Sequence, residues 1–296
     1  MKVLIFGGNS FTASHFGWKN ELDTLLVTRS HFTYQLSQNG AEKSINKLIQ
    51  EFNPDVVINL ISVAATALDD CKNYLSTNFL ISKNILDGCA MGPIKPKKFI
   101  QVSSAHVYGP IESSSICEKT SLNPKSPYAK TKTMADMLAS LYENYFKVII
   151  TRPFNYSGAG QNVENFFLPK LINAAHNRES KITLGNINLV RDFSDVRDIS
   201  SYYRALVMNH EANGIINLCS GKGYLLGEIV EEVQRLSGHY FDIEKDDSLG
   251  GGLQSKTQIG SNDKLIQVTG LHPQYSITDT IRWMLESMSS KKRKEI

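Results

Sequence analysis

Near its N-terminus the chain reads Val3-Leu4-Ile5-Phe6-Gly7-Gly8-Asn9-Ser10-Phe11-Thr12-Ala13. The first four residues are typical of a buried strand, and the small residues after them predict a tight turn into a helix. Glycine lets a backbone approach a pyrophosphate, and the free N–H groups at a helix start favour the anion. Only Gly7 matches the dinucleotide fingerprint, because Ser10 and Ala13 stand at its second and third glycine positions. The turn alone therefore fits either a dinucleotide site or an ordinary strand–helix connection.

Outward from this turn, short aliphatic runs alternate with longer helical patterns through the first half of the chain. Strands are expected at residues 3–6, 24–28, 56–60, 99–102 and 148–151. Helices are expected at residues 45–52, 74–89 and 128–145. Such alternation indicates βαβ units, so the expected fold class is α/β, with a doubly wound parallel sheet (a Rossmann fold) between two layers of helices. This context favours the dinucleotide interpretation of the turn.

The second half of the chain has a Pro-, Gly- and Asn-rich exit from the fifth strand and then mixed short elements. One further strand at 215–218 is placed to rejoin the first sheet, and Asp and Gly residues in 246–252 predict a loop. We therefore expect a smaller C-terminal substrate-binding lobe built from two segments. The expected divisions are a nucleotide-binding Rossmann domain at 1–155, which 190–220 rejoins, the lobe at 156–189 and 221–288, and a basic tail at 289–296.

The composition excludes several classes of protein. Hydrophobic residues make up 41% and charged residues 21% of the 296 residues, which is ordinary globular usage. The net charge is only +3 and the one dense basic run is 291–294, so no nucleic-acid partner is expected. The four scattered cysteines suggest neither a metal site nor a disulfide framework. With no signal peptide visible and no apolar run long enough to span a bilayer, we expect a soluble, cytoplasmic protein with no membrane partner.

The residues after the second expected strand, Thr28-Arg29-Ser30, bear on the choice of cofactor. A protein specific for NAD usually carries an acidic residue there, which binds the ribose 2′-hydroxyl. Arginine and hydroxyl groups instead suit a 2′-phosphate, because guanidinium pairs bidentately with phosphate oxygens. NADP(H) is therefore the expected cofactor, and NAD(H) is the alternative if Arg29 is an ordinary exposed loop residue.

A second group of residues opens the long helix expected at 128–145. It reads Ser126-Pro127-Tyr128-Ala129-Lys130-Thr131-Lys132, so Tyr128 and Lys132 lie four apart on one helical face. A tyrosine, with an ordinary pKa of about 10, is a poor acid–base group at neutral pH unless a nearby cation stabilises its phenolate. Lys132 can supply that cation, which makes Tyr128 a candidate general acid–base residue.

The fourth expected strand leads into Gln101-Val102-Ser103-Ser104-Ala105-His106-Val107-Tyr108-Gly109. Ligands of a doubly wound sheet bind beyond the carboxyl ends of its strands, where Ser104 would lie. Its hydroxyl, beside Tyr128, could hydrogen-bond a substrate carbonyl and the alkoxide that develops from it. Ser104, Tyr128 and Lys132 are together the predicted catalytic residues of an NAD(P)-dependent oxidoreductase.

These motifs resemble those of the extended short-chain dehydrogenases, the NAD-dependent epimerase/dehydratase family, over nearly the whole chain. The matching pieces are the N-terminal turn and residues 78–86, 104–109, 128–132 and 217–221. Residues 152–161 and 185–198 are similar to the branch that contains GDP-mannose 4,6-dehydratases and GDP-4-keto-6-deoxymannose reductases. The resemblance implies a nucleoside-diphosphate sugar as substrate, and a homodimer that packs the helix bearing Tyr128 against its twin.

The resemblance also implies roles for individual residues. Arg191 would grip the nucleotide pyrophosphate, although it could instead form a structural ion pair with Asp192 or Asp195. Asn155 would face the substrate or the nicotinamide. The expected substrate-binding residues are Ser104, His106, Asn155, Lys170 and Arg191. The expected cofactor-binding residues are Gly7, Asn9, Ser10, Phe11, Thr12, Arg29, Ser30, Leu60, Asn78, Ser103, Tyr128, Lys132, Pro153 and Asn155.

The residues after Ser104 bear on the reaction. Dehydratases of the family place an acidic residue two positions later, whereas this chain has His106, which is either an acid–base group or a pocket-lining residue. Arg29 favours a reductase over a 4-epimerase, because a reductant must exchange with the cellular NADPH pool. We expect NADPH-dependent reduction of the 4-keto group of a nucleoside-diphosphate 4-keto-6-deoxy sugar. An NAD-dependent 4-epimerase and a non-catalytic NADP(H) sensor or scaffold are the alternatives, and GDP, dTDP and UDP all stay open as the nucleotide.

Overall fold

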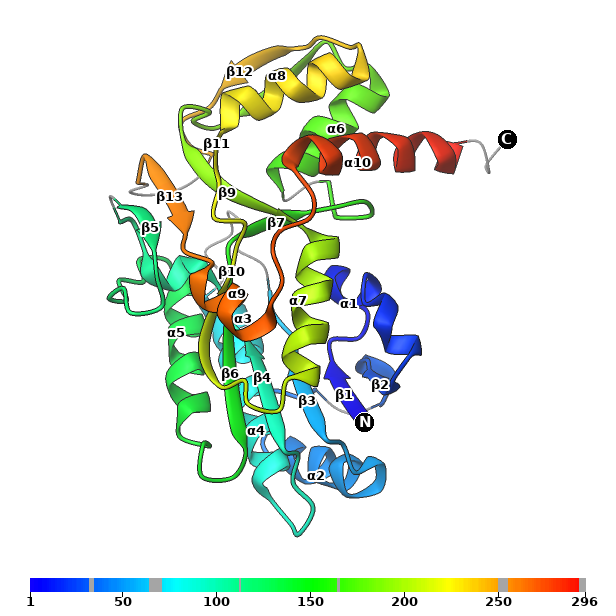
Figure 1. The fold of residues 1–296 in the computed structure, drawn as a ribbon, viewed down its shortest axis with the longest axis vertical. Coiled ribbons are helices and arrows are strands. Elements are labelled where there is room, and N and C mark those ends of the chain that lie inside the picture. The colour runs from blue at the N-terminus through cyan, green and yellow to red at the C-terminus, as the bar shows by residue number, and fades with distance from the viewer. Residues whose placement is uncertain (32–34, 64–70, 112, 164–165, 250–254, 293–296) are drawn as a thin grey trace.

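Six strands form a parallel sheet in the computed structural model, which describes residues 1–31, 35–63, 71–111, 113–163, 166–249 and 255–292 (Figure 1). The strands are β1 (Lys2–Phe6), β2 (Asp23–Val27), β3 (Val56–Asn59), β4 (Lys98–Val102), β6 (Lys147–Pro153) and β10 (Gly214–Leu218). Their order is β10-β6-β4-β3-β1-β2, and every neighbouring pair is parallel. The prediction of a doubly wound α/β fold is confirmed. The winding reverses between β1 and β3, and ligands of such sheets bind at the carboxyl ends of those strands.

Helices cover both faces of this sheet because successive side chains of a buried strand point to opposite faces. In β1, Leu4 and Phe6 belong to the core beneath one helical layer, and Val3 and Ile5 belong to the core beneath the other. The first layer contains α2 (Ala41–Phe52), α4 (Ile81–Ala90) and α5 (Pro127–Ser140). The second contains α1 (Phe11–Ser14), α7 (Val196–Met208) and α9 (Asp263–Thr269). Short 3-10 turns lie at η1 (Gly17–Asn20), η2 (Arg29–His31) and η4 (Ala105–Tyr108).

Helix α5 is shorter than the sequence predicted. The expected helix at 128–145 ends at Ser140, because the amide N–H of Leu141 bonds to the Leu138 carbonyl three residues back and tightens the last turn. This turn brings Phe146 into the core. The helix expected at 74–89 also differs, since α3 (Cys71–Tyr74) joins α4 through a π-helical turn, η3 (Leu75–Leu80).

A smaller lobe lies over the carboxyl edge of the sheet (Figure 1). Its three helices, which enclose a hydrophobic core of their own, are α6 (Phe167–Asn177), α8 (Leu226–Ser237) and α10 (Ile277–Lys292). Residues 289–292 therefore belong to α10, whereas the sequence predicted a tail there; residues 293–296 lie outside the described part of the chain.

Two small sheets accompany these helices. One pairs β8 (Lys181–Leu184) with β12 (Asp242–Lys245). In the other, whose order is β11-β9-β13-β5, β7 also pairs with β9. Its strands are β5 (Ser113–Ile116), β7 (Asn155–Ser157), β9 (Val190–Asp195), β11 (Gly223–Leu225) and β13 (Thr257–Gly260). The chain thus passes from the small sheet at β9 back to the large sheet at α7 and β10. Of the loop expected at 246–252, residues 250–252 lie outside the described residues.

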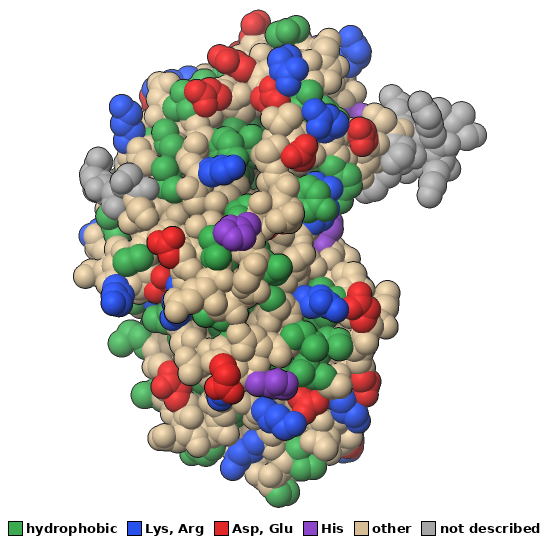
Figure 2. Space-filling model, viewed as in Figure 1, with side chains coloured by type: hydrophobic (Ala, Val, Ile, Leu, Met, Phe, Trp, Pro, Cys, Tyr) green, Lys and Arg blue, Asp and Glu red, His purple; other side chains and the backbone are tan. Residues whose placement is uncertain are grey.

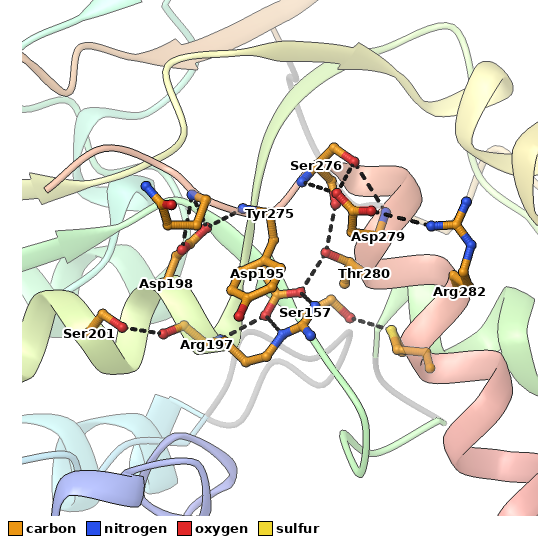
Figure 3. Close-up of polar contacts among 12 residues, drawn as sticks. Ser157, Asp195, Arg197, Asp198, Ser201, Tyr275, Ser276, Asp279, Thr280 and Arg282 are labelled. Atoms are coloured by element: carbon orange, nitrogen blue, oxygen red, sulfur yellow. Dashed lines mark hydrogen bonds and ion pairs between the residues drawn. The ribbon is translucent and has the colours of Figure 1, made fainter.

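Helix α10 is fastened to the start of α7 by a cluster of polar and aromatic contacts (Figure 3). The guanidinium of Arg197 binds Asp195 through two nitrogens, at 2.9 and 2.7 Å, and lies 3.6 Å from the ring centroid of Tyr275. Thr280 of α10 donates to the same Asp195 at 2.8 Å. Arg197 also lies 4.2 Å from the ring centroid of Trp283 on α10, so a hydrogen bond and a cation–π contact hold the last helix of the lobe against the helix that covers the sheet.

The surface drawn in Figure 2 carries Lys and Arg side chains interspersed with Asp and Glu, with no large field of one sign on that face. Within the described residues, no helix is both long enough and apolar enough to cross a bilayer.

Candidate active site

The turn after β1 requires both of its glycines. Gly7 has φ +87°, and a Cβ on Gly8 would lie 2.7 Å from the Cβ of Leu26. The amide N–H groups of both glycines bond to the Val27 carbonyl, at 3.2 and 3.1 Å. Ser10 then caps α1, its hydroxyl accepting from the amide of Ala13 at 3.2 Å. At the carboxyl end of β1 the turn therefore has no side chains at Gly7 and Gly8. This suits close approach of a pyrophosphate to the backbone.

A residue that the sequence analysis missed lies beside this turn. The hydroxyls of Thr12 and Tyr156 are 2.8 Å apart, and the Phe11 ring stacks on Tyr156 with centroids 6.2 Å apart. Tyr156 is in β7, so its approach to α1 depends on the long return of the chain after β6. Its signals in the sequence were its position inside the Pro-, Gly- and Asn-rich segment and inside the family-like stretch 152–161.

The second strand ends in hydroxyl groups, as expected. Thr28 and Ser30 bring their hydroxyl oxygens to 2.7 Å of each other, and His31 contributes its Nδ1 atom 3.1 Å from the hydroxyl of Thr28. The backbone of Arg29 lies in η2, but its side chain is outside the described part of the chain. The described groups offer donors at the place where a 2′-phosphate was predicted.

Tyr128 and Lys132 come from the first two turns of α5, which Ser126 caps by accepting from the amide of Ala129 at 3.1 Å. Lys132 is only 1% exposed, and its ammonium donates to the Val102 carbonyl at 2.8 Å. Burial lowers the pKa of Lys132 to about 8, and the charge of Asp136 acts in the opposite direction. Lys132 is therefore held beside the end of β4, one helical turn from Tyr128.

Tyr128 is half-buried with its hydroxyl facing Ser104 and Ser62. Burial raises the pKa of Tyr128 to about 12, and the two serine hydroxyls lower it. We expected Lys132 to lower this pKa directly, but in this structure the ammonium is turned to Val102 instead. Tyr128 is consequently a protonated phenol at neutral pH, ready to donate a proton.

Ser104 and His106 form a close pair after β4. The Ser104 hydroxyl lies 3.0 Å from Nδ1 of His106 and accepts from the His106 amide at 3.2 Å. The His106 ring meets Tyr128 edge-on, with centroids 5.6 Å apart. His106 is exposed at the site, but desolvation of its ring by the neighbouring residues and the positive charge of Arg191 lower its pKa below the usual range, so the ring is neutral at neutral pH. A neutral imidazole can hydrogen-bond a substrate without adding charge to the site.

Arg191 approaches from the small sheet. One of its terminal nitrogens, Nη1, donates to the carbonyls of Val190 at 2.8 Å and Ser255 at 3.1 Å. Its neighbour Asp192 is fully buried and accepts from Ser220 and Gly221. The other nearby carboxylate, Asp195, pairs with Arg197. The positive charge of Arg191, on β9 of the small sheet, thus acts on His106, which lies in η4 after β4 of the large sheet.

The remaining predicted residues differ in where their side chains lie. Leu60, Ser103 and Pro153 are buried at the carboxyl ends of β3, β4 and β6, which places them at the expected edge. Asn78 is buried and links the segment after β3 to α5, accepting from the Val63 amide and donating to Thr131. Asn9 is exposed at the turn, and the Asn155 side-chain amide donates to the Asp192 carbonyl at 3.1 Å. Lys170 instead directs its ammonium to the Thr183 carbonyl at 2.6 Å, inside the lobe.

A Rossmann sheet with a bare glycine turn and a Ser-Tyr-Lys set at its carboxyl edge defines a short-chain dehydrogenase type of site. The model of the NAD dependent epimerase/dehydratase family matches residues 6–219. The chain belongs to this family, and the resemblance seen in the sequence is confirmed.

Individual relatives agree with this assignment. The chain is 25% identical over 300 residues to GDP-6-deoxy-D-talose 4-dehydrogenase of Aggregatibacter actinomycetemcomitans, covering 100% of this chain and 99% of the relative. It is 27% identical over 252 residues to GDP-6-deoxy-D-mannose reductase of Pseudomonas aeruginosa, covering 82% and 83%. The structure of RMD from Pseudomonas aeruginosa complexed with NADPH has a TM-score of 0.84 at 26% identity, covering 98% of this chain and 99% of that one.

Proposed function

We propose that this protein reduces the 4-keto group of a nucleoside-diphosphate 4-keto-6-deoxy sugar with NADPH. The observation that carries the proposal is the placement of Ser104, Tyr128 and Lys132 at the same edge of the sheet as the bare turn at Gly7 and Gly8. Two full-length or nearly full-length relatives are named for GDP-6-deoxy sugars, and one similar structure holds NADPH.

The cofactor would be held by groups at the carboxyl ends of β1, β2 and β4. The turn at Gly7 and the start of α1 would hold the pyrophosphate, and Thr28, Arg29 and Ser30 would hold the 2′-phosphate. Lys132 would exchange its bond with Val102 for the nicotinamide ribose. When bound, NADPH supplies the hydride that reduces the carbonyl carbon and is itself oxidised to NADP⁺.

The proton comes from this chain. Tyr128 keeps its proton at neutral pH because burial raises its pKa to about 12, and it faces the hydroxyl of Ser104. Ser104 would donate a hydrogen bond to the substrate carbonyl, and Tyr128 would transfer its proton to the oxygen as the carbon is reduced. The product is an alcohol, and the phenolate of Tyr128 then regains a proton from solvent.

The substrate would lie between the sheet edge and the small lobe. Arg191 supplies a cation for the diphosphate, and His106 and Asn155 supply neutral hydrogen-bonding groups. Lys170 could join them only by giving up its bond to Thr183. The residue two positions after Ser104 is His106 and not a carboxylate, which argues against a dehydratase.

A 4-epimerase is the second candidate, because several relatives are named as UDP-glucose 4-epimerases. Epimerisation uses the same acid–base groups but returns the hydride to the sugar, so it consumes no NADPH overall. Net cofactor oxidation therefore separates the two functions, and a sensor would bind cofactor without turnover.

We also propose a cytoplasmic homodimer. All four cysteines are unpaired, which fits a reducing compartment. Apolar side chains stand exposed along one side of α5 and just after it, including Met134, Met137 and Leu141, the last 71% exposed. Of these three, Leu141 also lines a cavity of about 690 Å³, whose other walls come from α4, the end of α5 and the start of α2. A second copy of α5 would cover this apolar surface.

The test is a reductase assay with the purified protein. NADPH oxidation would be followed with GDP-, dTDP- and UDP-linked 4-keto-6-deoxy sugars, beside the Tyr128→Phe variant. Oxidation with one substrate that disappears in the variant supports the reductase and identifies the nucleotide. Absence of oxidation with every sugar, in a protein that still binds NADPH, rejects the reductase.

A further inference from the structure

Helix α5 presents a third charged residue on the face that carries Tyr128 and Lys132. Asp136 follows Lys132 by four residues, as Lys132 follows Tyr128, so the three side chains share one side of the helix. Asp136 is only 3% exposed. No step of the proposed reaction has yet used this buried carboxylate.

Asp136 is bound by an equally buried arginine from the neighbouring strand. Nε of Arg152 lies 3.2 Å from Oδ2 of Asp136, and both side chains are at most 4% exposed. Arg152 also donates to the Tyr108 hydroxyl at 3.2 Å, and that hydroxyl donates to Asn217 at 2.7 Å. Asn217 is the partner of Arg152 in the register of β6 and β10. These contacts hold the Arg152 side chain between Asp136 on α5 and the strands of the sheet.

The network continues from Asn217 into the backbone. The Asn217 side-chain amide donates to the Ile116 carbonyl at 2.9 Å, and its main-chain N–H donates to the Glu118 carboxylate at 2.8 Å. Four polar side chains thus link α5 through β6 to β10. Arg152 has little freedom to move, and Asp136 is consequently fixed as well.

One oxygen of Asp136 remains outside the pair with Arg152. Within the described part of the chain, Oδ1 of Asp136 and the hydroxyl oxygen of Ser103 are buried without a fully formed hydrogen bond. Ser103 nevertheless lies close enough to lower the pKa of Asp136. Ser103 directly follows Val102, whose carbonyl receives the ammonium of Lys132. Asp136 and Lys132 thus both lie against the end of β4, Asp136 beside Ser103 and Lys132 at the carbonyl of Val102.

A buried ion pair is a weak source of stability, since desolvation of the two charges offsets most of their attraction. Its position suggests a different use. Burial lowers the pKa of Lys132 and so favours loss of its proton, and the charge of Asp136 opposes this effect. Lys132 in turn helps to lower the pKa of Asp136, which burial raises to about 6. The two groups therefore keep each other ionised near neutral pH.

We propose that Asp136 is a positioning residue for the proposed reduction, which keeps the ammonium of Lys132 charged, and that Arg152 anchors Asp136 for this purpose. The inference rests on the proposed function and explains how a lysine with almost no exposure stays cationic. Once Lys132 exchanges its bond with Val102 for the nicotinamide ribose, its charge would stabilise the phenolate left on Tyr128 after proton transfer. The charged or titratable groups around this pair are Tyr128 on α5, Arg152 on β6 and the hydroxyl of Tyr108 after β4.

The first measurement needs neither cofactor nor substrate. The protein would be labelled with ¹³C at the lysine ε carbon, and the Lys132 signal, assigned with the Lys132→Arg variant, would be titrated with pH by NMR. In Asp136→Asn we expect the pKa of Lys132 to fall by about one unit or more, which is at least tenfold in proton binding. Asp136→Glu should restore most of the loss. Asp198→Asn, which alters another buried carboxylate on α7, should leave the titration of Lys132 unchanged.

An unchanged pKa of Lys132 in a folded Asp136→Asn protein would overturn the proposal. If that variant does not fold, the test uses the unmodified protein. The chemical shift of the Asp136 carboxyl carbon must then change at the pH where Lys132 titrates, and that of the Lys132 ε carbon at the pH where Asp136 titrates. Independent titrations of the two groups would overturn the proposal. In the reductase assay, Asp136→Asn should lower kcat with little change in KM and move the alkaline limb of the pH profile to lower pH. Failure of the unmodified protein to reduce any sugar would reject the reductase while leaving the NMR result intact.

Discussion

The ammonium nitrogen of Lys132 lies 2.8 Å from the carbonyl oxygen of Val102, the last residue of β4. Ser104 follows Val102 by two residues, and Tyr128 precedes Lys132 by one turn of α5. This single hydrogen bond therefore joins the two elements that carry the predicted catalytic residues. The relative placement of the serine, tyrosine and lysine depends on packing between α5 and the sheet.

Removal of the Tyr128 hydroxyl should abolish most of the reduction. Tyr128→Phe leaves the ring in place against His106 but removes the proton donor, so kcat/KM should fall by about 10²- to 10⁴-fold. NADPH binding, measured by fluorescence, should persist. Tyr240→Phe, on an exposed side chain of the lobe, is the matched control and should behave as the unmodified protein does. Equal activity of the two variants would remove Tyr128 from the mechanism.

The pH dependence of kcat/KM should report Lys132. Its pKa is lowered to about 8, so its charge is present below this pH and is lost as the pH rises through it. Activity should therefore decline on the alkaline side of about pH 8. Lys132→Arg keeps a cation at higher pH. The alkaline limb of the pH profile of this variant's residual activity should therefore move to higher pH. An alkaline limb at the same pH in both proteins would assign it to another group.

The turn at the cofactor site should tolerate no side chain at Gly8. A methyl group there would lie 2.7 Å from the Cβ of Leu26, so Gly8→Ala must displace β2 or the turn and should cost about 1–3 kcal/mol of unfolding free energy. Gly17→Ala provides the comparison, because no atom lies within 4 Å of the added methyl group. Urea unfolding of both variants tests the difference. A Gly8→Ala protein as stable as Gly17→Ala would show that the turn is loosely packed.

Asp198 should make the protein less stable as the pH rises. Burial raises its pKa to about 6 in the folded state, above its ordinary value of 3.8, although the amides of Gln274 and Tyr275 bond to it. A group whose folded pKa is raised contributes stability that is present below its unfolded pKa and is lost as the pH rises through the folded value. Asp198→Asn should therefore reduce the fall in unfolding free energy between pH 4 and pH 7 by about 1–3 kcal/mol.

Thermal or urea unfolding across this pH range tests the expectation for Asp198. Comparison with the unmodified protein cancels the contributions of all other groups. Asp242→Asn on the exposed strand β12 is the control and should keep the original pH dependence. An Asp198→Asn protein with the same dependence would show that this carboxylate does not titrate as described.

Association should depend on the exposed end of α5. A charge in the centre of an apolar interface is costly, so Met137→Glu with Leu141→Glu should convert the proposed dimer to monomers. Met208→Glu, on an exposed methionine at the end of α7, should not. Sedimentation analysis measures the result. Dimers that persist in the double variant would place the interface elsewhere on the surface.

Local patterns in the sequence carried much of the active-site prediction. Ser126 and Pro127 mark the start of α5, and the four-residue spacing of Tyr128 and Lys132 places them on one helical face wherever the helix lies. Asp136 lies four residues after Lys132, so the same spacing along the helix could have identified it. Arg152 could not, because its pairing with Asp136 depends on how closely α5 lies against β6.

The sequence by itself determined the parallel sheet and the order of its parts, because strand and helix periodicities are local and the crossover rules leave few ways to combine them. Only the tertiary structure decided the charge states and contacts of the site. In that structure Lys132 hydrogen-bonds Val102, Lys170 hydrogen-bonds Thr183, and the hydroxyls of Tyr156 and Thr12 lie within hydrogen-bond distance. Burial and pairing of polar groups arise from elements far apart in the chain, so no local pattern specifies them.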